Sequence, residues 1–454
     1  MVDQAVRRPV TNRGALAVLL SCDFMITLDF FVSNVAIPAI RRDLHASAAQ
    51  VQLIVVGYAL AYAAGLITWG RLGDIHGRRR LFAIGLGVFT AASVACGLAG
   101  NADMLILARV AQGLAAGVMA PQVLAILGTT YTGAQRAKVF AISGLSKGVA
   151  GVFGQLIGGL LIAADSGGLG WRLCFLVNLP IGLVALAFTR RAVPESRAGG
   201  DTRLDGWSSV LAAVALIALV LPLVEGREHG WPLWTWVSLA VAVVLLTAFV
   251  ARQRTASTPL VDPALFRDRA FAVGVASTAL YFAAMGAFLL VLAVYLQDER
   301  GMSPVGSGVL YTAIGVGFFV MTIRGAALAG RIGVRMVSVG ALVLTAGWAL
   351  LTLLTDLPVV WLAPALLVCG LGMGLIMSQL TARTLAGVPA RLAGAGSGVL
   401  NTAVQIGSAL GVALIGIVFY GARSGFVPAL VTLVVVGLVL AALLRRLPQT
   451  RSEQ

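Results

Sequence analysis

The sequence predicts an all-α polytopic membrane protein that crosses the bilayer fourteen times. Its 454 residues are 59% hydrophobic and only 11% charged, and their mean hydropathy is +0.95, whereas soluble domains are about half apolar and a quarter charged. Because a single hydrophobic core stops growing well below this chain length, such a composition needs an apolar solvent around the protein. Apolar windows of about 20 residues, the length that spans a bilayer, recur along the whole chain.

Short polar, glycine-containing or proline-containing breaks separate these windows. The first window follows a basic tail, but it is long and holds two aspartates, so we expect a spanning helix and not a cleavable signal peptide. The first seven helices are expected at residues 14–39, 50–70, 81–100, 104–127, 139–164, 172–189 and 206–224. The second seven are expected at residues 234–251, 270–296, 305–329, 334–355, 358–382, 394–421 and 426–444.

Basic residues are distributed unevenly between alternate loops. One side holds 25 of the 33 Lys and Arg residues and the other side holds six, while Arg109 and Lys147 lie inside helices. Since cytoplasmic loops carry the excess of Lys and Arg, we expect both termini in the cytoplasm. The formal net charge of +15 therefore reports topology, and nucleic acid is not an expected partner.

The four cysteines all lie in apolar segments, with no CxxC motif and no His/Cys pair, so neither a disulfide framework nor a metal site is predicted. The sequence has three histidines, all in loops, and no HExxH motif, phosphate-binding loop or paired-acid motif. These absences disfavour a membrane enzyme and an ATP-driven pump. A membrane-embedded ligand sensor without transport is the alternative from a different class.

Four ionisable side chains lie inside predicted spans, where a charge costs about 2.5 to 3.5 kcal/mol even on a lenient insertion scale. Asp23 and Asp29 flank the middle of the first helix, Arg109 lies in the fourth and Lys147 in the fifth. The two aspartates are separated by a net rotation of about 240° around a helix, so we expect them to have different neighbours. Intramembrane charges of this kind commonly mark ion or substrate pathways.

Burial disfavours the charged form of a carboxyl group and a nearby cation favours it, so an aspartate beside a movable arginine can gain and lose a proton. We hypothesise that Asp29 carries the proton, that Arg109 modulates it, and that substrate binds when Asp29 is ionised; the alternative is a static pair. Asp23 is expected to be a second proton site, a cation-recognition group or a hydrogen-bonded structural residue. Lys147 is expected to neutralise an aspartate or attract an anionic substrate group, with snorkelling toward the cytoplasm as the alternative.

Further polar and aromatic residues inside the spans are candidates for lining a substrate cavity. Each could equally make a hydrogen bond between helices. Together with Lys147, these candidates are Gln112, Gln122, Tyr281, Tyr311, Gln379, Asn401 and Gln405.

A loop between the second and third predicted helices reads Gly70-Arg-Leu-Gly-Asp74-Ile-His-Gly77-Arg78-Arg79-Arg80. It closely resembles the loop signature of the major facilitator superfamily. Gly70 and Gly77 permit tight turns, and Asp74 can pair with an arginine or a helix N-terminus across the bundle. The resemblance implies a latch, made by Asp74 and Arg78, that holds one face closed. For the next two arginines we prefer the interpretation that they only mark the cytoplasmic side.

Other segments narrow the resemblance to the fourteen-helix drug:proton antiporters of that superfamily. Matching segments begin at Leu28-Asp29, Arg109-Val-Ala-Gln112, Trp171-Arg172, Leu265-Phe266 and Gly396-Ser-Gly398, and a glycine-rich stretch fills the fifth helix. This helix-five motif comprises Gly148, Gly151, Gly154, Gln155, Gly158 and Gly159. Gln155 replaces the proline that the family normally has after this glycine, so the proline-assisted bend is not predicted.

The resemblance implies a major facilitator fold of two six-helix bundles, at residues 14–189 and 270–444, plus two inserted helices in the linker region 190–269 and tails at 1–13 and 445–454. It implies export of small, largely hydrophobic compounds in exchange for protons by alternating access. Proton-coupled uptake or a metabolite-specific permease is the alternative, because the helix-five departure removes part of the antiporter signature. We expect no enzyme activity, no cofactor besides the proton gradient, and a monomer in a bacterial cytoplasmic membrane.

Overall fold

The computed structural model describes residues 13–131, 133–197, 206–256, 259, 261–389, 392–422 and 425–446. Within these residues the chain forms helices and turns and no strand. Thirteen helical segments are each long and apolar enough to span a membrane, and α5 (Gly133–Ala164) adds a fourteenth as one bent span. The predicted all-α fold with fourteen spans is therefore confirmed. Most of the two predicted tails lies outside the described residues.

The helices follow the predicted order along the chain. The first six spans are α1 (Arg13–Asp43), α2 (Ala48–His76), α3 (Arg78–Gly97), α4 (Ala102–Thr130), α5, and the pair α6 (Leu173–Leu176) and α7 (Asn178–Ala192). The inserted spans are α8 (Gly206–Glu225) and α9 (Leu233–Thr255). The last six are α10 (Arg269–Val294), α11 (Pro304–Ile332), α12 (Met336–Leu354), α13 (Leu362–Leu385), α14 (Ala393–Gly421) and α15 (Phe426–Leu444). Short 3-10 helices are η1 (Ser166–Gly168), η2 (Gly170–Arg172), η3 (Pro263–Arg267), η5 (Gly333–Arg335) and η6 (Val359–Trp361), and η4 (Tyr295–Glu299) is a π-helix.

Two spans differ from the prediction. The predicted loop at residues 70–80 is helical except at Gly77, where the chain adopts a φ of +105° between α2 and α3. Polarity ends an apolar window but does not end a helix, because a helix can extend past the hydrocarbon layer. The sixth span, predicted as one helix, is interrupted at Val177 between α6 and α7. Pro180 lies in the first turn of α7, where its missing N–H costs no helical hydrogen bond.

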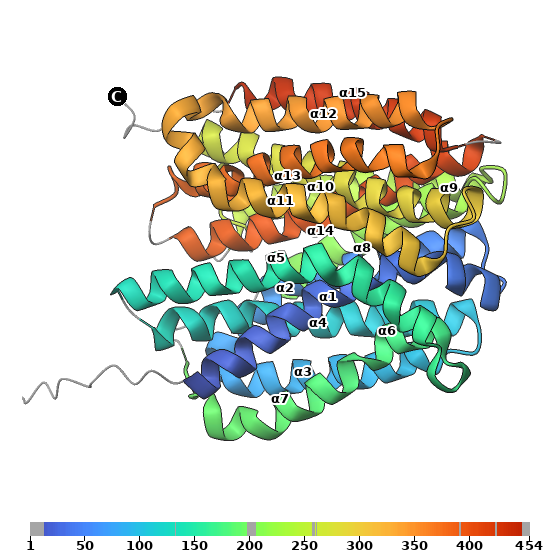
Figure 1. Ribbon diagram of the computed structural model, residues 1–454. Helices are drawn as coiled ribbons and strands as arrows, with labels where there is room; N and C mark the ends of the chain where they lie inside the picture. The colour runs from blue at the N-terminus through green and yellow to red at the C-terminus, as the bar shows by residue number, and fades with distance from the viewer. Residues whose placement is uncertain are drawn as a thin grey trace, which may run out of the picture.

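The helices lie side by side in two groups, with α1–α7 in the lower half and α10–α15 in the upper half of Figure 1. We call the end where α1 begins and α15 ends, on the left of Figure 1, the N-terminal face, and the opposite end the far face. The groups touch where α5 packs on α11, α2 on α14 and α1 on α10. Helix α8 contacts α2, α14 and α9, so the inserted pair touches both groups.

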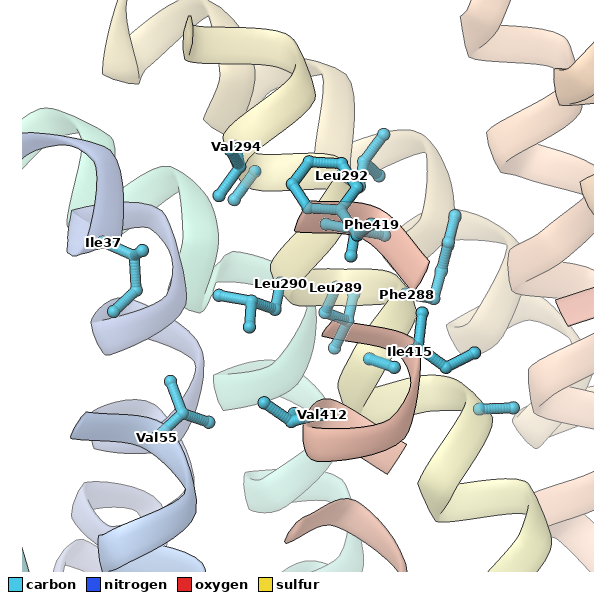
Figure 2. Packing of buried hydrophobic residues seen from close by; sticks show 14 of the residues in the cluster. Ile37, Val55, Phe288, Leu289, Leu290, Leu292, Val294, Val412, Ile415 and Phe419 are labelled. Atoms are coloured by element: carbon cyan, nitrogen blue, oxygen red, sulfur yellow. The ribbon is translucent and has the colours of Figure 1, made fainter. Parts of the chain in front are cut away.

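The buried hydrophobic residues divide differently near the two faces. One continuous cluster joins both groups in the far half and continues within the second group as far as Leu444 at the end of α15. Figure 2 shows Ile37 of α1 and Val55 of α2 beside Leu290 of α10 and Val412 of α14. Toward the N-terminal face, a second cluster is confined to the segments of α1–α7 and their connections, and a third, small one surrounds Phe271. Because burial of apolar surface is the main force that holds helices to a common core, the two groups are joined mainly at the far half.

Candidate functional site

A cavity of about 630 Å³ lies between the two groups of helices. Its walls come from α1, α2 and α5 on one side and from α10, α11, α13 and α14 on the other. It reaches from Gln155 and Tyr311 toward the N-terminal face, where Gly144 and Thr322 line it. This volume lies in the range of small-molecule binding sites.

Aromatic rings from both groups make up much of the cavity wall. The first group contributes Phe30, Phe31, Tyr58 and Tyr62. The second group contributes Tyr281, Phe282, Tyr311, Phe318 and Phe319. Large, rigid rings bury much apolar surface, so this wall suits a hydrophobic or aromatic ligand.

Asp29 lies near the middle of α1 with 1% of its surface exposed, and its carboxylate accepts three hydrogen bonds. Its Oδ2 atom accepts from Arg109 Nη1 at 2.6 Å. Its Oδ1 atom accepts from Gln112 Nε2 at 2.8 Å and from Asn178 Nδ2 at 2.9 Å. All three partners are donors, so this arrangement satisfies an ionised carboxylate paired with an arginine.

Arg109 is as buried as its partner, and its guanidinium is held on several sides. Its Nε atom donates to the Ile54 carbonyl at 3.2 Å, and Nη1 donates to Gln112 Oε1 at 2.6 Å. The guanidinium carbon lies 4.1 Å from the centroid of the Tyr58 ring, which makes a cation–π contact. Tyr58 lines the cavity, whereas neither member of the buried ion pair is among the described lining residues. The Asp29–Arg109 pair therefore lies one side chain behind the cavity wall.

Local helix geometry assembles the partners of this ion pair. Arg109 and Gln112 are three residues apart on α4 and therefore share one face of that helix. Asn178 is the first residue of α7, directly after the interruption at Val177. Ser93 of α3 accepts hydrogen bonds from Gln112 at 2.8 Å and from Asn178 at 3.2 Å, and so fixes both amides.

Asp23 makes a second ion pair that opens on the cavity. Lys147 Nζ lies 3.1 Å from Asp23 Oδ1, and Ser143 Oγ donates to Asp23 Oδ2 at 2.6 Å. The Asp23 side chain is 5% exposed and that of Lys147 is 42% exposed. Both residues line the cavity, and of the described lining residues only these two carry a formal charge. The two aspartates of α1 thus have different neighbours, as their spacing predicts.

Four of the eight cavity candidates line the cavity: Lys147, Tyr281, Tyr311 and Gln405. The Tyr311 hydroxyl donates to the Leu289 carbonyl at 2.5 Å, whereas the Tyr281 hydroxyl has no hydrogen-bond partner among the described residues. These four residues therefore lie in the cavity wall, and contact between them and a substrate remains a prediction.

The other four candidates are not among the described residues that line this cavity. Gln112 belongs to the Asp29 cluster, and Gln122 donates to the Trp69 carbonyl at 2.7 Å. Gln379 is half-buried, Asn401 is exposed, and neither is among the described lining residues. The physical reason is that polarity at membrane depth indicates a need for a partner, and that partner can be a neighbouring helix as readily as a cavity.

The signature between α2 and α3 forms a local ion pair. Arg78 donates through Nε to Asp74 Oδ1 at 2.8 Å, across the Gly77 turn. The predicted pairing of Asp74 with an arginine is present, but its partner is four residues away and the contact stays within the first group of helices. A Cβ atom at Gly70 would be in ordinary contact, at 3.5 Å, with Pro121 of α4.

Arg79 has specific partners, contrary to the interpretation that it only marks a membrane side. Its backbone N–H donates to Glu195 Oε1 at 3.0 Å, and its side chain donates to the Val193 carbonyl at 3.3 Å. These bonds attach the start of α3 to the segment that follows α7. The turn is thereby fixed to the end of the sixth span.

The glycines of the helix-five motif serve different contacts. Gly151, Gly154 and Gly158 face α1: a Cβ at Gly154 would lie 2.6 Å from the Cβ of Phe31, and one at Gly158 would lie 2.4 Å from Cγ1 of Val35. Gly148 is different, because a Cβ there would meet no described atom within 4 Å. Close approach of α1 and α5 therefore explains the later glycines and not the first.

The same stretch of α5 also touches α11 in the other group. A Cβ at Gly159 would lie 2.5 Å from the Pro304 carbonyl oxygen, and one at Gly308 would lie 2.8 Å from the Gln155 carbonyl oxygen. Glycines on both helices thus allow backbone-to-backbone contact between the groups. Helix α5 bends by 45° between its segments Lys138–Gly151 and Phe153–Ala164, although proline is absent at position 155. A glycine-rich stretch can bend without proline.

Ion pairs at the far face add to this contact. Arg41 and Arg42, at the end of α1, lie 3.5 and 3.7 Å from the carboxylate of Asp298 in η4. Gln297 Nε2 donates to the Val35 carbonyl at 3.0 Å. With the shared hydrophobic cluster, these contacts close the far face while the cavity extends toward the N-terminal face.

Sequence reasoning missed Asn178, Ser93, Tyr58 and Ser143 as site residues. Asn178 could have been found, because an amide inside a spanning segment needs a partner and belongs to a segment already noted. The two serines gave no signal, since serine is common in membrane helices and can bond its own backbone. Tyr58 became relevant only through its place between the cavity and Arg109.

Two groups of membrane helices around a shared cavity, with buried ion pairs beside it, are the architecture of a secondary transporter that works by alternating access. Residues 19–412 match the Major Facilitator Superfamily, and the chain belongs to this family.

Several curated relatives align with most of the chain. It is 38% identical over 419 residues to the probable actinorhodin transporter of Streptomyces coelicolor, covering 90% of this chain and 72% of that protein. It is 37% identical over 425 residues to a puromycin resistance protein of Streptomyces alboniger, covering 90% and 82%. It is 34% identical over 431 residues to a cephamycin export protein of Amycolatopsis lactamdurans, covering 92% and 88%.

Solved structures with the same fold are distant in sequence. A peptide transporter crystallised with sulfate superposes with a TM-score of 0.71 at 18% identity, covering 95% of this chain and 94% of that one. A POT family transporter in complex with 5-aminolevulinic acid gives 0.72 at 14% identity, covering 96% of both chains. At these identities the likeness shows the fold alone.

Proposed function

We propose that this protein exports small, largely hydrophobic compounds, such as drugs, antibiotics or related metabolites, in exchange for protons. The observation that carries the proposal is the cavity of about 630 Å³ between the two helix groups, with aromatic walls and a buried acid–arginine pair directly behind them. Three relatives named for transport of, resistance to or export of three different antibiotics support export over uptake.

Alternating access follows from the asymmetry of the contacts. Residues 14–189 and 270–444 are the units that rock, with 190–269 as the connection between them. In the conformation described, the far face is closed and the cavity extends toward the N-terminal face. The bias of Lys and Arg to the loops of that face supports a cytoplasmic location for both termini. This conformation therefore takes up substrate from the cytoplasm.

Proton coupling is assigned to Asp29, with Arg109 as its modulator and Asp23 as a second acid within reach of the cavity. A proton on Asp29 removes the charge that holds Arg109, which frees the guanidinium to shift against Tyr58. Because Tyr58 lines the cavity, this shift links the protonation state to the shape of the substrate site. Substrate and proton then favour opposite conformations of the bundle.

The cell biology follows from the same proposal. We place the protein in a bacterial cytoplasmic membrane as a monomer, with the proton gradient as its energy source and no other cofactor. The protein transports its substrate and catalyses no reaction. Its partners are the substrate, protons and the lipid bilayer.

Export is tested first in cells and then in vesicles. We expect expression in an efflux-deficient bacterium to raise the inhibitory concentration of several hydrophobic antibiotics. Each such compound should then accumulate in inverted membrane vesicles only when a pH difference, acid inside, is imposed, because protons that leave the vesicle drive the substrate into it. Accumulation is measured with radiolabelled compound.

The control is a pair of membrane preparations of opposite orientation made from the same cells. Gradient-driven accumulation in right-side-out vesicles instead of inverted ones would show uptake. A protein that binds these compounds but moves none of them under any gradient would be a sensor, and the export proposal would be rejected.

A further inference from the structure

In the Asp23–Lys147 ion pair, the lysine is much more exposed to the cavity than the aspartate. We propose that the preferred substrates are aromatic anions: an acidic group binds Lys147, and neutral oxygens of the same molecule bind deeper polar side chains. This inference rests on the proposed function and specifies its substrate class. It assigns roles to Lys147 and to Gln155, Tyr281 and Ser408.

Exposure decides which charge of the pair a ligand meets. The Asp23 carboxylate is 5% exposed, and its two oxygens are occupied by Lys147 and Ser143. The Lys147 side chain is 42% exposed. An ammonium group has three N–H donors, and one salt bridge at 3.1 Å leaves donors for a ligand. The cavity therefore offers a cation although the pair as a whole is neutral.

A cationic ligand would meet an obstacle at the same place. To reach Asp23 it would have to displace Lys147 and leave that ammonium without its partner in a largely apolar cavity. An anionic ligand adds to the existing pair and displaces nothing. Since specificity is a difference between affinities, this asymmetry favours anions over cations of the same skeleton.

A second observation points to neutral oxygens on the ligand. Gln155, Tyr281 and Ser408 line the cavity, and each is at least 97% buried. Both amide atoms of Gln155, the Tyr281 hydroxyl and the Ser408 hydroxyl have no hydrogen-bond partner among the described residues. Buried polar atoms usually have partners, so these groups are suited to bind ligand oxygens such as ketones, phenols or amides.

Their arrangement sets the size of the ligand. Lys147 and Gln155 are eight residues apart on α5, about 12 Å along the helix axis. Aromatic rings such as Phe31 and Phe282 line the same cavity. A fused aromatic skeleton with an acidic group near one end and keto or hydroxyl oxygens farther along it fits this spacing.

The test uses four probes that share one skeleton: anthraquinone-2-carboxylate, its carboxamide, its trimethylammonium-methyl analogue, and anthracene-2-carboxylate, which lacks the quinone oxygens. Equilibrium binding is measured on the full-length protein in lipid nanodiscs, with empty nanodiscs as the blank. We expect the carboxylate to bind about tenfold or more tightly than the carboxamide, because it gains a charge-assisted hydrogen bond. The cationic probe should bind most weakly.

The variants separate recognition from folding. Lys147→Met should remove the preference for carboxylate over carboxamide, and Lys138→Met, which changes an exposed lysine of the same helix, should keep it. Because Lys147→Met leaves Asp23 unpaired, the charge-neutral double variant Asp23→Asn/Lys147→Met serves as the second test and should also lose the preference. Gln155→Leu should weaken the binding of anthraquinone-2-carboxylate but not that of anthracene-2-carboxylate, which has no quinone oxygens.

The proposal is overturned if the wild-type protein binds carboxylate and carboxamide equally, if the cationic probe binds most tightly, or if the double variant keeps the wild-type preference. Binding is measured without a gradient, so its result does not depend on export. Loss of the anion preference with intact gradient-driven export rejects this inference alone. If the wild-type protein prefers anions but exports none of them, the proposed function is rejected and the proposed anion site stands.

Discussion

Asp29 and Arg109 hold each other in the interior of the first helix group, each 1% exposed. Removing one partner of such a pair leaves a buried charge uncompensated, which typically costs about 3 to 5 kcal/mol. The hydrogen bonds from Gln112 and Asn178 to the carboxylate increase the cost of removing Asp29, because these two amides and Arg109 would lose their acceptor together. Two explanations of the pair, a proton carrier and a static link between α1 and α4, make different predictions for variants.

We predict that Asp29→Asn abolishes gradient-driven efflux and lowers the melting temperature of the purified protein, because Arg109 is left buried without its anion. The double variant Asp29→Asn/Arg109→Gln removes both charges and should recover stability. If Asp29 carries the proton, efflux stays absent in the double variant. Melting in detergent and efflux from proteoliposomes are measured on the same preparations, and recovery of both would establish the static pair.

Glycines on α5 act at the scale of a helix pair. Gly158 allows α1 to pass so closely that an added Cβ would lie 2.4 Å from a Val35 methyl carbon and 3.3 Å from the Val32 Cα atom. A valine side chain branches at Cβ and has little freedom to move aside. Gly148 on the same helix faces open space instead. The two glycines are therefore a matched pair for testing what the motif does.

Gly158→Ala should lower the free energy of unfolding by about 1 to 3 kcal/mol through overpacking between α1 and α5. Gly148→Ala should leave stability unchanged or raise it by up to about 1 kcal/mol, since alanine is the better helix former. Both variants are compared by thermal melting in detergent. Equal melting temperatures for the two would show that close packing is not the role of Gly158.

At the scale of the molecule, the two helix groups meet at the far face through backbone contact, ion pairs and a common hydrophobic cluster. The ion pairs of Asp298 involve partly exposed arginines, and such pairs contribute about 0 to 1 kcal/mol. The hydrophobic cluster and the glycine contact between α5 and α11 therefore carry most of the closure. Closure at one face is the condition for access at the other.

Gly308→Val should open the far face, because its Cβ would lie 2.8 Å from the Gln155 carbonyl oxygen and 2.9 Å from the Leu156 Cα atom. A steric penalty of about 1 to 3 kcal/mol in the closed conformation changes the equilibrium constant between the two conformations by about 5- to 150-fold. Spin labels at Met104→Cys and Val360→Cys, two exposed sites at this face in different groups, should move apart.

Gly306→Val is the matched control, because among the described atoms a Cβ there meets only side-chain atoms of Met302 and Ser303, at 3.2 and 3.3 Å, and no backbone of the other helix group. The native cysteines are all buried, which limits labelling to the introduced sites. An unchanged distance distribution in Gly308→Val would mean that this backbone contact does not hold the far face closed.

Much of the fold was predictable, because hydropathy acts locally: a window of about 20 apolar residues needs lipid whatever its neighbours are. The net rotation between Asp23 and Asp29 likewise predicted separate surroundings, since helix geometry alone decides it. The extension of α2 to His76 and the interruption at Val177 were not predicted. Helix ends depend on caps, turns and contacts that an apolar window does not contain.

The candidate site was predictable as a set of residue types and not as an arrangement. The presence of acids and bases inside particular membrane helices can be derived from the sequence alone, because a charge at membrane depth needs a stabilising partner in any fold. The packing of the helices was needed to show that Gln112 and Asn178 donate hydrogen bonds to Asp29, whereas Lys147 lines the cavity. Which helix a polar face meets depends on packing between segments far apart in the chain, and that information is absent from the periodicity of any one helix.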